Sequence, residues 1–345
     1  MKKYIKAQLI LQDGSRFNGF SFGYNGSTNG EVVFNTGMVG YPESLTDPSY
    51  WGQVLIYTYP LIGNYGVPIN RKYFESNGIK IRGLIVSNYI DEYSHYQAKQ
   101  SLGEWLKKEK IPAIFGIDTR ALTKKLREKG VMLGSINDCD FEDPNIRNLA
   151  SEVSIKKPEL YGSGKKKIIL VDCGMKNSIL KNLLKRNIRV KKVPWDYNYL
   201  NEEYDGIFLS NGPGDPEKCE QTIKYIKEAY KNNKPIFGIC LGCQIMGLAA
   251  GARTYKLKYG HRSQNQPCIE RDTKRCYLTS QNHGFAIKEN SLSKNWETWF
   301  INANDNTIEG IRHRSKPFFA VQFHPEATPG PVDTEFIFDE FIHKL

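Results

Sequence analysis

The sequence predicts an α/β protein in which a mixed α+β domain precedes a doubly wound, mostly parallel sheet. Its 345 residues are enough for about two domains of roughly 150 residues each. Residues 1–60 alternate short β-like runs with turns rich in Gly and Asn. From residue 167 onward, short apolar runs alternate with helix patterns instead. That alternation is typical of parallel βαβ units.

The amino-terminal domain is expected to span residues 1–150. Asp118 and Thr119 are suitable caps for a helix at 118–129, and Gly130 is a suitable stop. A second helix is predicted at 96–108, and strands are predicted at 7–11, 16–22, 31–34, 53–57 and 78–87.

Residues 151–167 are predicted to form a linker, because they are polar, contain one Pro and two Gly, and end in three lysines. The carboxy-terminal domain is then expected at 168–345. Its first strand, 167–171, is apolar after Lys167, as strands buried on both faces are. Further strands are predicted at 188–193, 206–209 and 235–239, helices at 176–185, 216–231, 241–250 and 332–343, and a strand-rich region at 252–323.

Composition and charge exclude several classes of protein. The net charge of +11 comes from dispersed lysines, and no nucleic-acid-binding motif accompanies it, so a solvated basic surface and no nucleic-acid partner are expected. No apolar run approaches the roughly 18 residues of a membrane helix, and the start does not resemble a signal peptide. The seven cysteines do not form a disulfide framework pattern. A cytoplasmic protein without membrane attachment is predicted.

The most informative motif is Cys240 between Gly238 and Gly242, directly after the strand predicted at 235–239. This G-x-C-x-G pattern is the cysteine form of a nucleophile elbow. The glycines remove side chains that would clash at the tight turn. A helix beginning at Leu241 points its amino terminus at the sulfur, which favours the thiolate, and the Leu241 N–H can stabilise an oxyanion. The motif alone also fits a buried structural cysteine.

A thiolate that attacks an amide needs a proton carrier, usually a histidine held by a third group. His324 follows a short apolar strand, and Glu326, two residues on, can orient its ring. His261 and His283 stand beside glycines in predicted loops and remain possible. Three others lie in polar or charged stretches and are expected at the surface: His95, His313 and His343.

Two further segments suit ligand binding. Residues 210–216 contain a Gly-Pro-Gly turn that follows a predicted strand and could bring backbone N–H groups to a substrate. Residues 281–285 join two β-like runs. Each segment is also compatible with an ordinary turn.

Together these segments resemble the class I (triad) glutamine amidotransferases. Residues 281–285 and 323–330 are similar to the small, glutamine-hydrolysing subunit of carbamoyl-phosphate synthetase. Other class I amidotransferases lack that subunit's amino-terminal domain, which four segments of this chain also resemble: 31–41, 45–50, 59–64 and 116–130. The resemblance therefore covers nearly the whole chain.

The resemblance implies a Cys240–His324–Glu326 triad that hydrolyses L-glutamine. Cys240 would attack the side-chain amide, His324 would pass a proton to the departing ammonia, and Glu326 would orient His324. The N–H groups of Leu241 and Gly212 would form the oxyanion hole. The family's glutamine-binding positions fall on Ser49, Gly212, Gly214, Leu241, Gln244, Asn282, Gly284 and Phe285. Because Ser49 belongs to the amino-terminal domain, the site is expected near the domain interface.

The resemblance also implies a partner. Ammonia would pass through an internal tunnel to a large synthetase subunit, which uses ATP, Mg and bicarbonate to make carbamoyl phosphate for arginine and pyrimidine biosynthesis. A heterodimer or a larger assembly of such pairs is expected. This chain has no P-loop, so neither a cofactor nor a metal is expected in it.

Two positions depart from the family's pattern. Cys243 stands where a His is usual, beside Gln244, and Cys173 stands where an aromatic residue is usual. Cys243 also completes a C-x-x-C with Cys240. Either it is a drifted neighbour, or a disulfide between the two switches the enzyme off.

Three other functions fit parts of this pattern. A zinc nucleobase deaminase also uses H-x-E and C-x-x-C, but there the H-x-E precedes the cysteines, whereas here it follows them. Another class I amidotransferase would lack the amino-terminal resemblance. A non-catalytic regulatory subunit would be expected to have lost a triad residue, and Cys240, His324 and Glu326 are all present.

Overall fold

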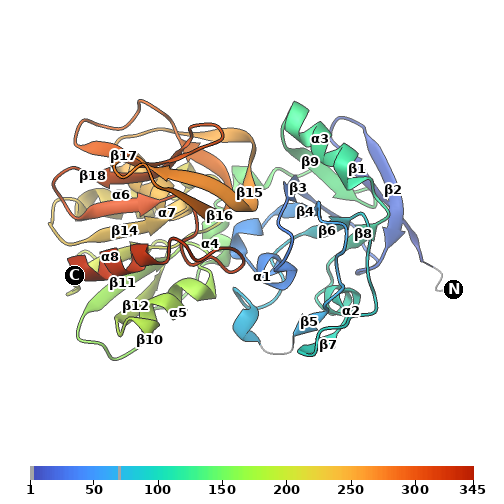
Figure 1. Ribbon diagram of the computed structural model, residues 1–345, viewed down its shortest axis with the longest axis horizontal. Coiled ribbons are helices and arrows are strands. Elements are labelled where there is room, and N and C mark those ends of the chain that lie inside the picture. Colours follow the sequence, from blue (N-terminus) through green and yellow to red (C-terminus); the bar gives the residue numbers. More distant parts are fainter. Residues whose placement is uncertain (1–3, 69–70) are drawn as a thin grey trace. The chain divides into compact units, whose positions relative to one another are not determined.

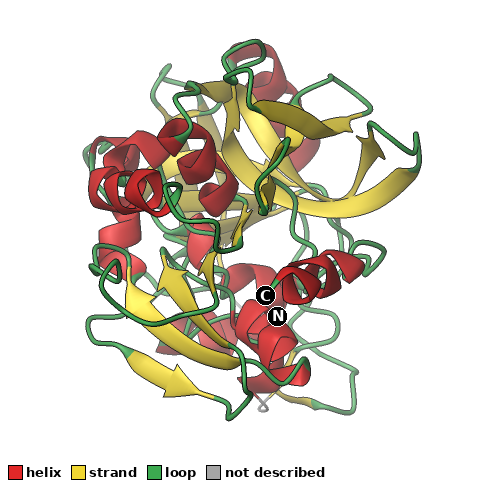
Figure 2. Ribbon diagram, turned by 90° about the vertical axis from the view of Figure 1, so that its left-hand side faces the viewer, coloured by secondary structure: helices red, strands yellow, loops and turns green. Residues whose placement is uncertain are grey.

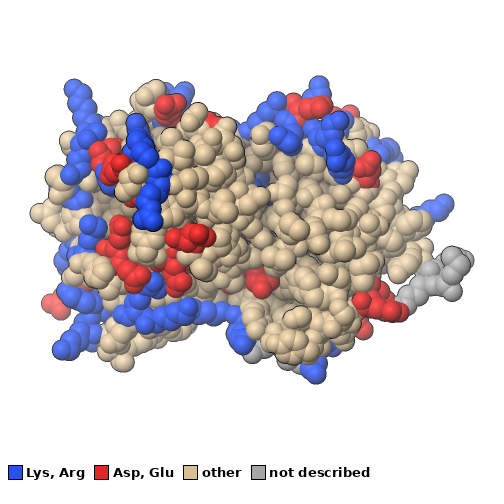
Figure 3. Space-filling view, in the orientation of Figure 1, with Lys and Arg blue, Asp and Glu red and all other residues tan. Residues whose placement is uncertain are grey.

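The computed structural model describes residues 4–68 and 71–345, and the chain divides into two compact units, Met1–Ile146 and Arg147–Leu345. Residues 1–3, the start of the amino-terminal segment considered above, lie outside the described residues. Figure 1 shows the elements of both units. On the face drawn in Figure 3, basic side chains are scattered among acidic ones. No helix in the described part of the chain is long and apolar enough to span a membrane.

The boundary expected near residue 150 falls between Ile146 and Arg147. Residues 151–167, expected as a linker, belong to the second unit and are partly regular. They include the end of α4 (Leu149–Val153), which Asn148 caps, and β10 (Glu159–Tyr161), which pairs antiparallel with β12 (Arg189–Pro194). Leu149 and Ala150 are buried, which explains why this polar stretch is anchored rather than free.

The first unit is built on a closed barrel whose strands follow one another in the order β1-β2-β8-β6-β4-β3-β9. The pairs β3–β4, β4–β6 and β6–β8 are parallel, and the others are antiparallel. The barrel strands are β1 (Lys6–Leu11), β2 (Arg16–Ser21), β3 (Thr28–Asn35), β4 (Gln53–Tyr57), β6 (Gly83–Val86), β8 (Ala113–Phe115) and β9 (Met132–Ile136). Outside the barrel lie β5 (Val67–Pro68), β7 (Ala98–Gln100), α1 (Tyr41–Leu45), α2 (Leu102–Lys108), α3 (Thr119–Lys129) and three short 3-10 turns, η1 (Pro48–Tyr50), η2 (Arg71–Tyr73) and η3 (Pro144–Ile146).

The helix predicted at 96–108 begins later, at Leu102, because Ser101 forms a capping box with Glu104 there. The residues before it form β7, which pairs with β5. The strand predicted at 78–87 is confined to β6. The helix predicted at 118–129 is confirmed: Asp118 accepts a hydrogen bond from the Ala121 N–H, and Gly130 ends the helix with a φ of 96°.

The second unit contains a ten-stranded sheet in the order β10-β12-β11-β13-β14-β19-β18-β17-β15-β16. The five strands from β12 to β19 are parallel, as predicted, but the remaining neighbours pair antiparallel, so the sheet is mixed rather than mostly parallel. The strands not yet given are β11 (Lys167–Asp172), β13 (Gly206–Leu209), β14 (Ile236–Ile239), β15 (Thr254–Glu270), β16 (Cys276–Ile287), β17 (Trp296–Asn302), β18 (Ile308–His313) and β19 (Phe318–Val321).

Helices cover both faces of this sheet, as the doubly wound prediction requires (Figure 2). Along β11, Ile168 and Leu170 pack with α5 (Asn177–Lys185) and α8 (Phe336–Lys344). The alternate residues Ile169 and Val171 pack with α6 and α7 on the other face. The remaining bounds are α6 (Glu220–Ala229), α7 (Leu241–Ala249) and the 3-10 turn η4 (Pro216–Lys218).

Several predicted elements of the second unit are corrected. The single helix predicted at 216–231 is divided into η4 and α6, and the helix predicted at 332–343 begins at Phe336. His261 and His283, expected in loops, lie opposite each other in β15 and β16. Gly260 has a φ of +72° and falls at a register shift between these strands. The glycine therefore marks a β-bulge within a strand rather than a loop.

Candidate active site

Cys240 occupies a strained turn between β14 and α7, with φ 55° and ψ −105°. The flanking glycines are required by close contacts. A Cβ on Gly238 would lie 2.7 Å from the backbone of Gly242, and a Cβ on Gly242 would lie 2.6 Å from the Leu209 carbonyl oxygen. Such approaches exclude any side chain at either position. The predicted nucleophile elbow is thus present, and the strain falls on the cysteine itself.

The elbow lies at the carboxyl end of the parallel strands, the edge at which open α/β sheets bind ligands. The Cys240 N–H donates to the Val321 carbonyl at 2.8 Å, which joins the elbow to the end of β19. The Cys240 Sγ donates to the Asn282 carbonyl at 3.7 Å. The helix α7 begins at the next residue, so its amino terminus faces the elbow.

His324 follows β19, the strand that pairs with β14, so the sheet brings it to the elbow. Its N–H donates to the Ser280 carbonyl at 2.9 Å, and its ring Nδ1 lies 2.6 Å from Glu326 Oε1. Both side chains are buried. The ring Nε2 has no hydrogen-bond partner among the described residues. The ring is therefore held by Glu326 on one side and available for proton transfer on the other.

The charges at this pair are strongly coupled. Burial opposes ionisation of Glu326, but Lys176 and His324 outweigh it and lower the pKa of Glu326 to about 2. Burial likewise opposes protonation of His324, but Glu326 and Cys240 raise the pKa of His324 to about 10. At neutral pH the pair is an imidazolium and a carboxylate, with Cys240 next to the imidazolium.

Lys176 is a residue of this site that the sequence motifs did not indicate. Its Nζ lies 3.1 Å from Glu326 Oε1 and also donates to the Ala327 carbonyl, and its side chain is only 3% exposed. Its N–H donates to Asn211 Oδ1 at 3.0 Å. The sequence analysis predicts Lys176 only as the first residue of a helix. Its position shortly after the carboxyl end of a parallel strand is the one sequence feature that indicates a role in this site.

The loop after β13 packs closely against the start of α7. A Cβ on Gly212 would lie 2.1 Å from the Cys173 carbonyl oxygen, and Gly214 has a φ of +87°. The Gly242 N–H donates to the Ser210 carbonyl at 3.1 Å. The predicted Gly-Pro-Gly segment therefore presents bare backbone beside the elbow, as an oxyanion-binding loop requires.

The predicted glutamine-binding residues of the second unit lie on α7, on β16 and on this loop. Gln244 Nε2 donates to the Phe285 carbonyl at 2.7 Å, which ties α7 to β16. The backbone carbonyl of Asn282 accepts a hydrogen bond from the Cys240 thiol. Ser49 belongs to the first unit, where it lies buried in η1 and its N–H donates to Asp47 Oδ1 at 2.9 Å.

Two family models match this chain. "Glutamine amidotransferase class-I" matches residues 169–344, which contain the elbow and the His324–Glu326 pair. "Carbamoyl-phosphate synthase small chain, CPSase domain" matches residues 9–136. The chain belongs to the class-I glutamine amidotransferases. Residues 9–136 are similar to the CPSase domain of a carbamoyl-phosphate synthase small chain.

Similar proteins cover nearly the whole of this amidotransferase chain. The "Multifunctional protein CAD" of Squalus acanthias is 53% identical over 97% of the chain, and the "Multifunctional protein pyr1-3" of Dictyostelium discoideum is 49% identical over 99%. The "Carbamoyl-phosphate synthase [ammonia], mitochondrial" of Homo sapiens is 49% identical over 99%. The chain spans only 16%, 17% and 24% of the lengths of these three relatives.

Cys243, one of the two residues expected to depart from the family's pattern, lies within the first turn of α7. Its N–H donates to the Cys240 carbonyl at 3.0 Å. Its side chain is fully buried, and this burial raises the pKa of its thiol well above the ordinary value. Cys240 and Cys243 are both free thiols in this structure. Cys243 therefore packs as a neutral apolar group in the core beneath the elbow.

Proposed function

We propose that this chain hydrolyses the side-chain amide of L-glutamine to glutamate and ammonia. The observation that carries the proposal is the meeting of a strained Cys240 elbow with the buried His324–Glu326 pair on the adjacent strand. A structural cysteine would need neither the strain nor a charged imidazole next to it. The triad favours a catalytic role over a regulatory subunit without chemistry.

In the proposed reaction, the Cys240 thiolate attacks the amide carbon and forms a tetrahedral intermediate. The N–H groups of Leu241 and Gly212 stabilise its oxyanion. His324, protonated at neutral pH, gives its proton to the amide nitrogen, and the C–N bond breaks to release ammonia. A water molecule then attacks the thioester, His324 takes its proton, and glutamate leaves as Cys240 is regenerated.

The substrate-binding residues in this proposal are the eight expected from the family resemblance. Gln244 and Phe285 are already joined by a hydrogen bond, which supports a shared role. Three of the eight are glycines, which offer only backbone groups, and the amide, amino and carboxylate groups of the substrate all need partners. The positions are Ser49, Gly212, Gly214, Leu241, Gln244, Asn282, Gly284 and Phe285.

We propose that the ammonia is used by a large carbamoyl-phosphate synthetase subunit, which would bind ATP and Mg and consume bicarbonate. The small-chain domain at 9–136 supports this partner. The partner is either a separate chain in a heterodimer or larger assembly, or a continuation of the same polypeptide, as in the much longer relatives. Carbamoyl phosphate for arginine and pyrimidine biosynthesis in the cytoplasm is the proposed role, with no cofactor in this chain.

Overall similarity does not by itself distinguish glutamine use from ammonia use, because the name of the human relative specifies ammonia. The side chains at the elbow favour glutamine. An enzyme supplied with free ammonia has no need for a thiol nucleophile with a charged imidazole beside it.

The test is glutamate release from L-glutamine by the purified chain, alone and with its synthetase partner, ATP and bicarbonate. Release that depends on Cys240 and increases with the partner is expected. A glutamine analogue that carries an electrophile should label Cys240 in the same preparation. Folded protein that neither releases glutamate nor is labelled at Cys240 would refute the proposal.

A further inference from the structure

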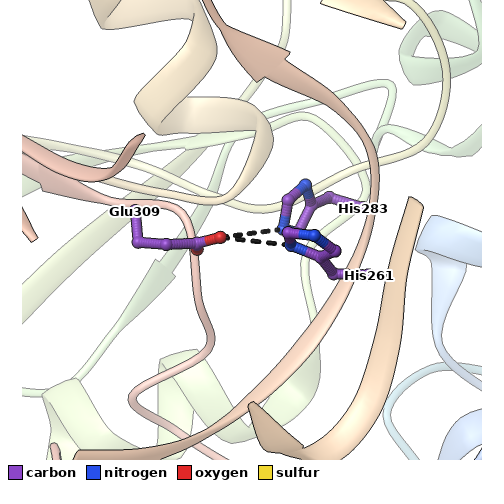
Figure 4. Close-up of side chains that lie close together, drawn as sticks. All are labelled: His261, His283 and Glu309. Carbon is purple, nitrogen blue, oxygen red and sulfur yellow. Dashed lines mark hydrogen bonds and ion pairs between the residues drawn. The ribbon is translucent and has the colours of Figure 1, made fainter. Parts of the chain in front are cut away.

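A second group of buried titratable side chains lies beside the triad without belonging to it. His261 on β15, His283 on β16 and Glu309 on β18 point toward one another (Figure 4). Glu309 Oε1 lies 3.2 Å from His261 Nδ1 and 3.7 Å from His283 Nε2. The two rings meet edge to face, with their centroids 4.9 Å apart. Three strands thus converge on one carboxylate.

Glu309 is fully buried, and its Oε2 has no hydrogen-bond partner among the described residues. A second carboxylate, Asp305, lies on the far side of His261 with its Oδ2 2.9 Å from Nε2. Burial opposes protonation of His261, but Asp305 and Glu309 outweigh it and raise the pKa of His261 to about 9. His261 is therefore a cation held between Asp305 and Glu309, and its charge opposes the rise that burial causes in the pKa of Glu309.

His283 connects this group to residues 282–285, which include three of the proposed glutamine-binding residues. Its Nδ1 lies 2.9 Å from the Phe285 carbonyl, which can only accept, so Nδ1 bears the hydrogen. Its Nε2 faces Gln281 Oε1 at 3.1 Å and Glu309. The Phe285 carbonyl also accepts from Gln244 Nε2 at 2.7 Å. One backbone oxygen of the glutamine site is therefore fixed from two sides.

The pleat of β16 separates the two groups of residues. Gln281 and His283 share one face of the strand, and Asn282 and Gly284 share the other. The Asn282 carbonyl approaches the Cys240 sulfur. His283 also pairs directly opposite His261 in the antiparallel ladder. The segment that lies along the active site is thus supported from behind by the His261–His283–Glu309 group.

We propose that Glu309 is a positioning residue for glutamine binding, acting through His261 and His283 on the Phe285 carbonyl and hence on residues 282–285. This inference rests on the proposed glutaminase function. Glu309 holds the charged His261 ring, and that ring meets neutral His283 edge to face, so the link from Glu309 to His283 runs through His261. Without the carboxylate, His261 is no longer held against His283, and His283 loses its fixed orientation.

The same three side chains form a set that could ligate a divalent cation. Gln281 Oε1, however, lies 3.0 Å from His261 Nδ1 and 3.1 Å from His283 Nε2, at hydrogen-bonding distances from both ring nitrogens. The Gln281 amide and the proton on His261 Nδ1 therefore occupy the centre of the group. This favours a hydrogen-bonded support over a metal site.

The test compares Glu309→Leu, Glu309→Gln and a control, Glu297→Gln, in the full chain. Glu297 lies on neighbouring β17 and pairs with Arg312 and Arg314, away from the histidines. Loss of a buried charged partner predicts a KM for glutamine raised by about tenfold or more in Glu309→Leu, with kcat changed by less than about threefold. Glu309→Gln keeps an acceptor and should recover most of the affinity, while Glu297→Gln should match the parent.

Glutamine affinity is also measured by calorimetry in a Cys240→Ala background, where no turnover is needed. Weaker glutamine binding by Glu309→Leu than by Glu309→Gln supports the inference. This holds even if the parent proves unable to hydrolyse glutamine, a result that would refute the proposed function but not the positioning role of Glu309. Equal KM values for Glu309→Leu and the parent, or an equal fall in kcat for both Glu309 variants, would overturn it. So would stoichiometric zinc in the parent that both variants lack, or no glutamine binding at all.

Discussion

The Nδ1 atom of His324 lies 2.6 Å from Oε1 of Glu326, and both side chains are buried. The two residues are separated by one position, so a single turn after β19 sets the orientation of the ring. Lys176, contributed by a distant part of the chain, holds the same carboxylate oxygen at 3.1 Å. Glu326 therefore stays ionised despite its burial, and this charge determines the protonation state of His324.

Cys240→Ala should abolish glutamate release, because it removes the thiol that forms the thioester and the neighbouring Cys243 thiol is buried in the core. We expect a rate below about a thousandth of that of the parent. Ammonia-dependent carbamoyl phosphate synthesis by the assembled enzyme should persist. Cys276→Ala, which alters an exposed cysteine, is the matched control and should retain full activity. Loss of both activities in a stably assembled complex would contradict the assigned role.

His324→Asn should lower the rate of glutamine hydrolysis by about 10²–10⁴-fold, the usual contribution of a positioned proton carrier. Asparagine is similar in polarity and smaller than histidine, so the fold should persist. His343→Asn, at an exposed position on α8, is the control and should be indistinguishable from the parent. Steady-state glutamate release measures both. A loss of less than about tenfold would place the proton carrier elsewhere.

The His324–Glu326 pair should stabilise the fold over a defined pH range. The lowered pKa of Glu326, about 2, contributes stability above its ordinary pKa of 4.5, and this is lost as the pH falls through about 2. The raised pKa of His324, about 10, contributes stability below its ordinary 6.5, and this is lost as the pH rises through about 10.

Urea denaturation of the parent and Glu326→Gln across pH 5–9 tests this expectation. The difference in the free energy of unfolding between the two should be largest near pH 5–6 and should shrink steadily as the pH rises. Glu297→Gln, at the partly exposed pair on β17, should show no comparable slope. A parent–variant difference that stays constant from pH 5 to 9 would mean that the two groups are not coupled as described.

Gly238→Ala should destabilise the chain and impair the nucleophile together. The added methyl group would lie 2.7 Å from the backbone of Gly242, so either β14 or α7 must shift. Overpacking of this kind costs about 1–3 kcal/mol. Urea denaturation and glutamate release on the same preparation would show both effects. Unchanged stability with unchanged activity would mean that the elbow adapts more easily than its contacts indicate.

Cys243 should remain unreactive in the folded protein. Its burial and its raised pKa keep it a neutral thiol, whereas Cys276 is exposed. Alkylation followed by peptide mass spectrometry should label Cys276 quickly and Cys243 only after unfolding. A disulfide between Cys240 and Cys243 after mild oxidation, reversed by a strong reductant with recovery of activity, would instead support the switch considered for the C-x-x-C pair.

The parts of the site that could be predicted from the sequence are those with local causes. The elbow follows from two glycines around Cys240, and His324 with Glu326 follows from a short motif at a strand end. Lys176 could not be predicted in the same way, because its bond to Glu326 joins residues 150 positions apart. The group around Glu309 was missed because Gly260 resembles a loop residue, and only strand pairing reveals the bulge.

In the fold, too, the elements with local causes could be predicted and those that depend on distant residues could not. The parallel strands β13 and β14 are apolar throughout, and β11 is apolar between Lys167 and Asp172, so their continuous apolar runs are sufficient to predict them. The antiparallel extension from β18 to β16 carries mixed residues, so its pairing depends on tertiary neighbours. α2 begins six residues after the start that the sequence predicts, because the cap at Ser101, rather than the helix propensity of the preceding residues, sets the boundary.

β19 is inserted between β14 and β18 in the middle of the sheet, although it is the last strand of the described chain. During synthesis on the ribosome, the elbow at Cys240 is therefore complete about 80 residues before the strand that brings its base. Until β19 docks, the nascent chain exposes two unpaired strand edges, a state prone to aggregation. The thiol lacks its base for the same interval. Catalytic competence and completion of the sheet thus occur in one late step.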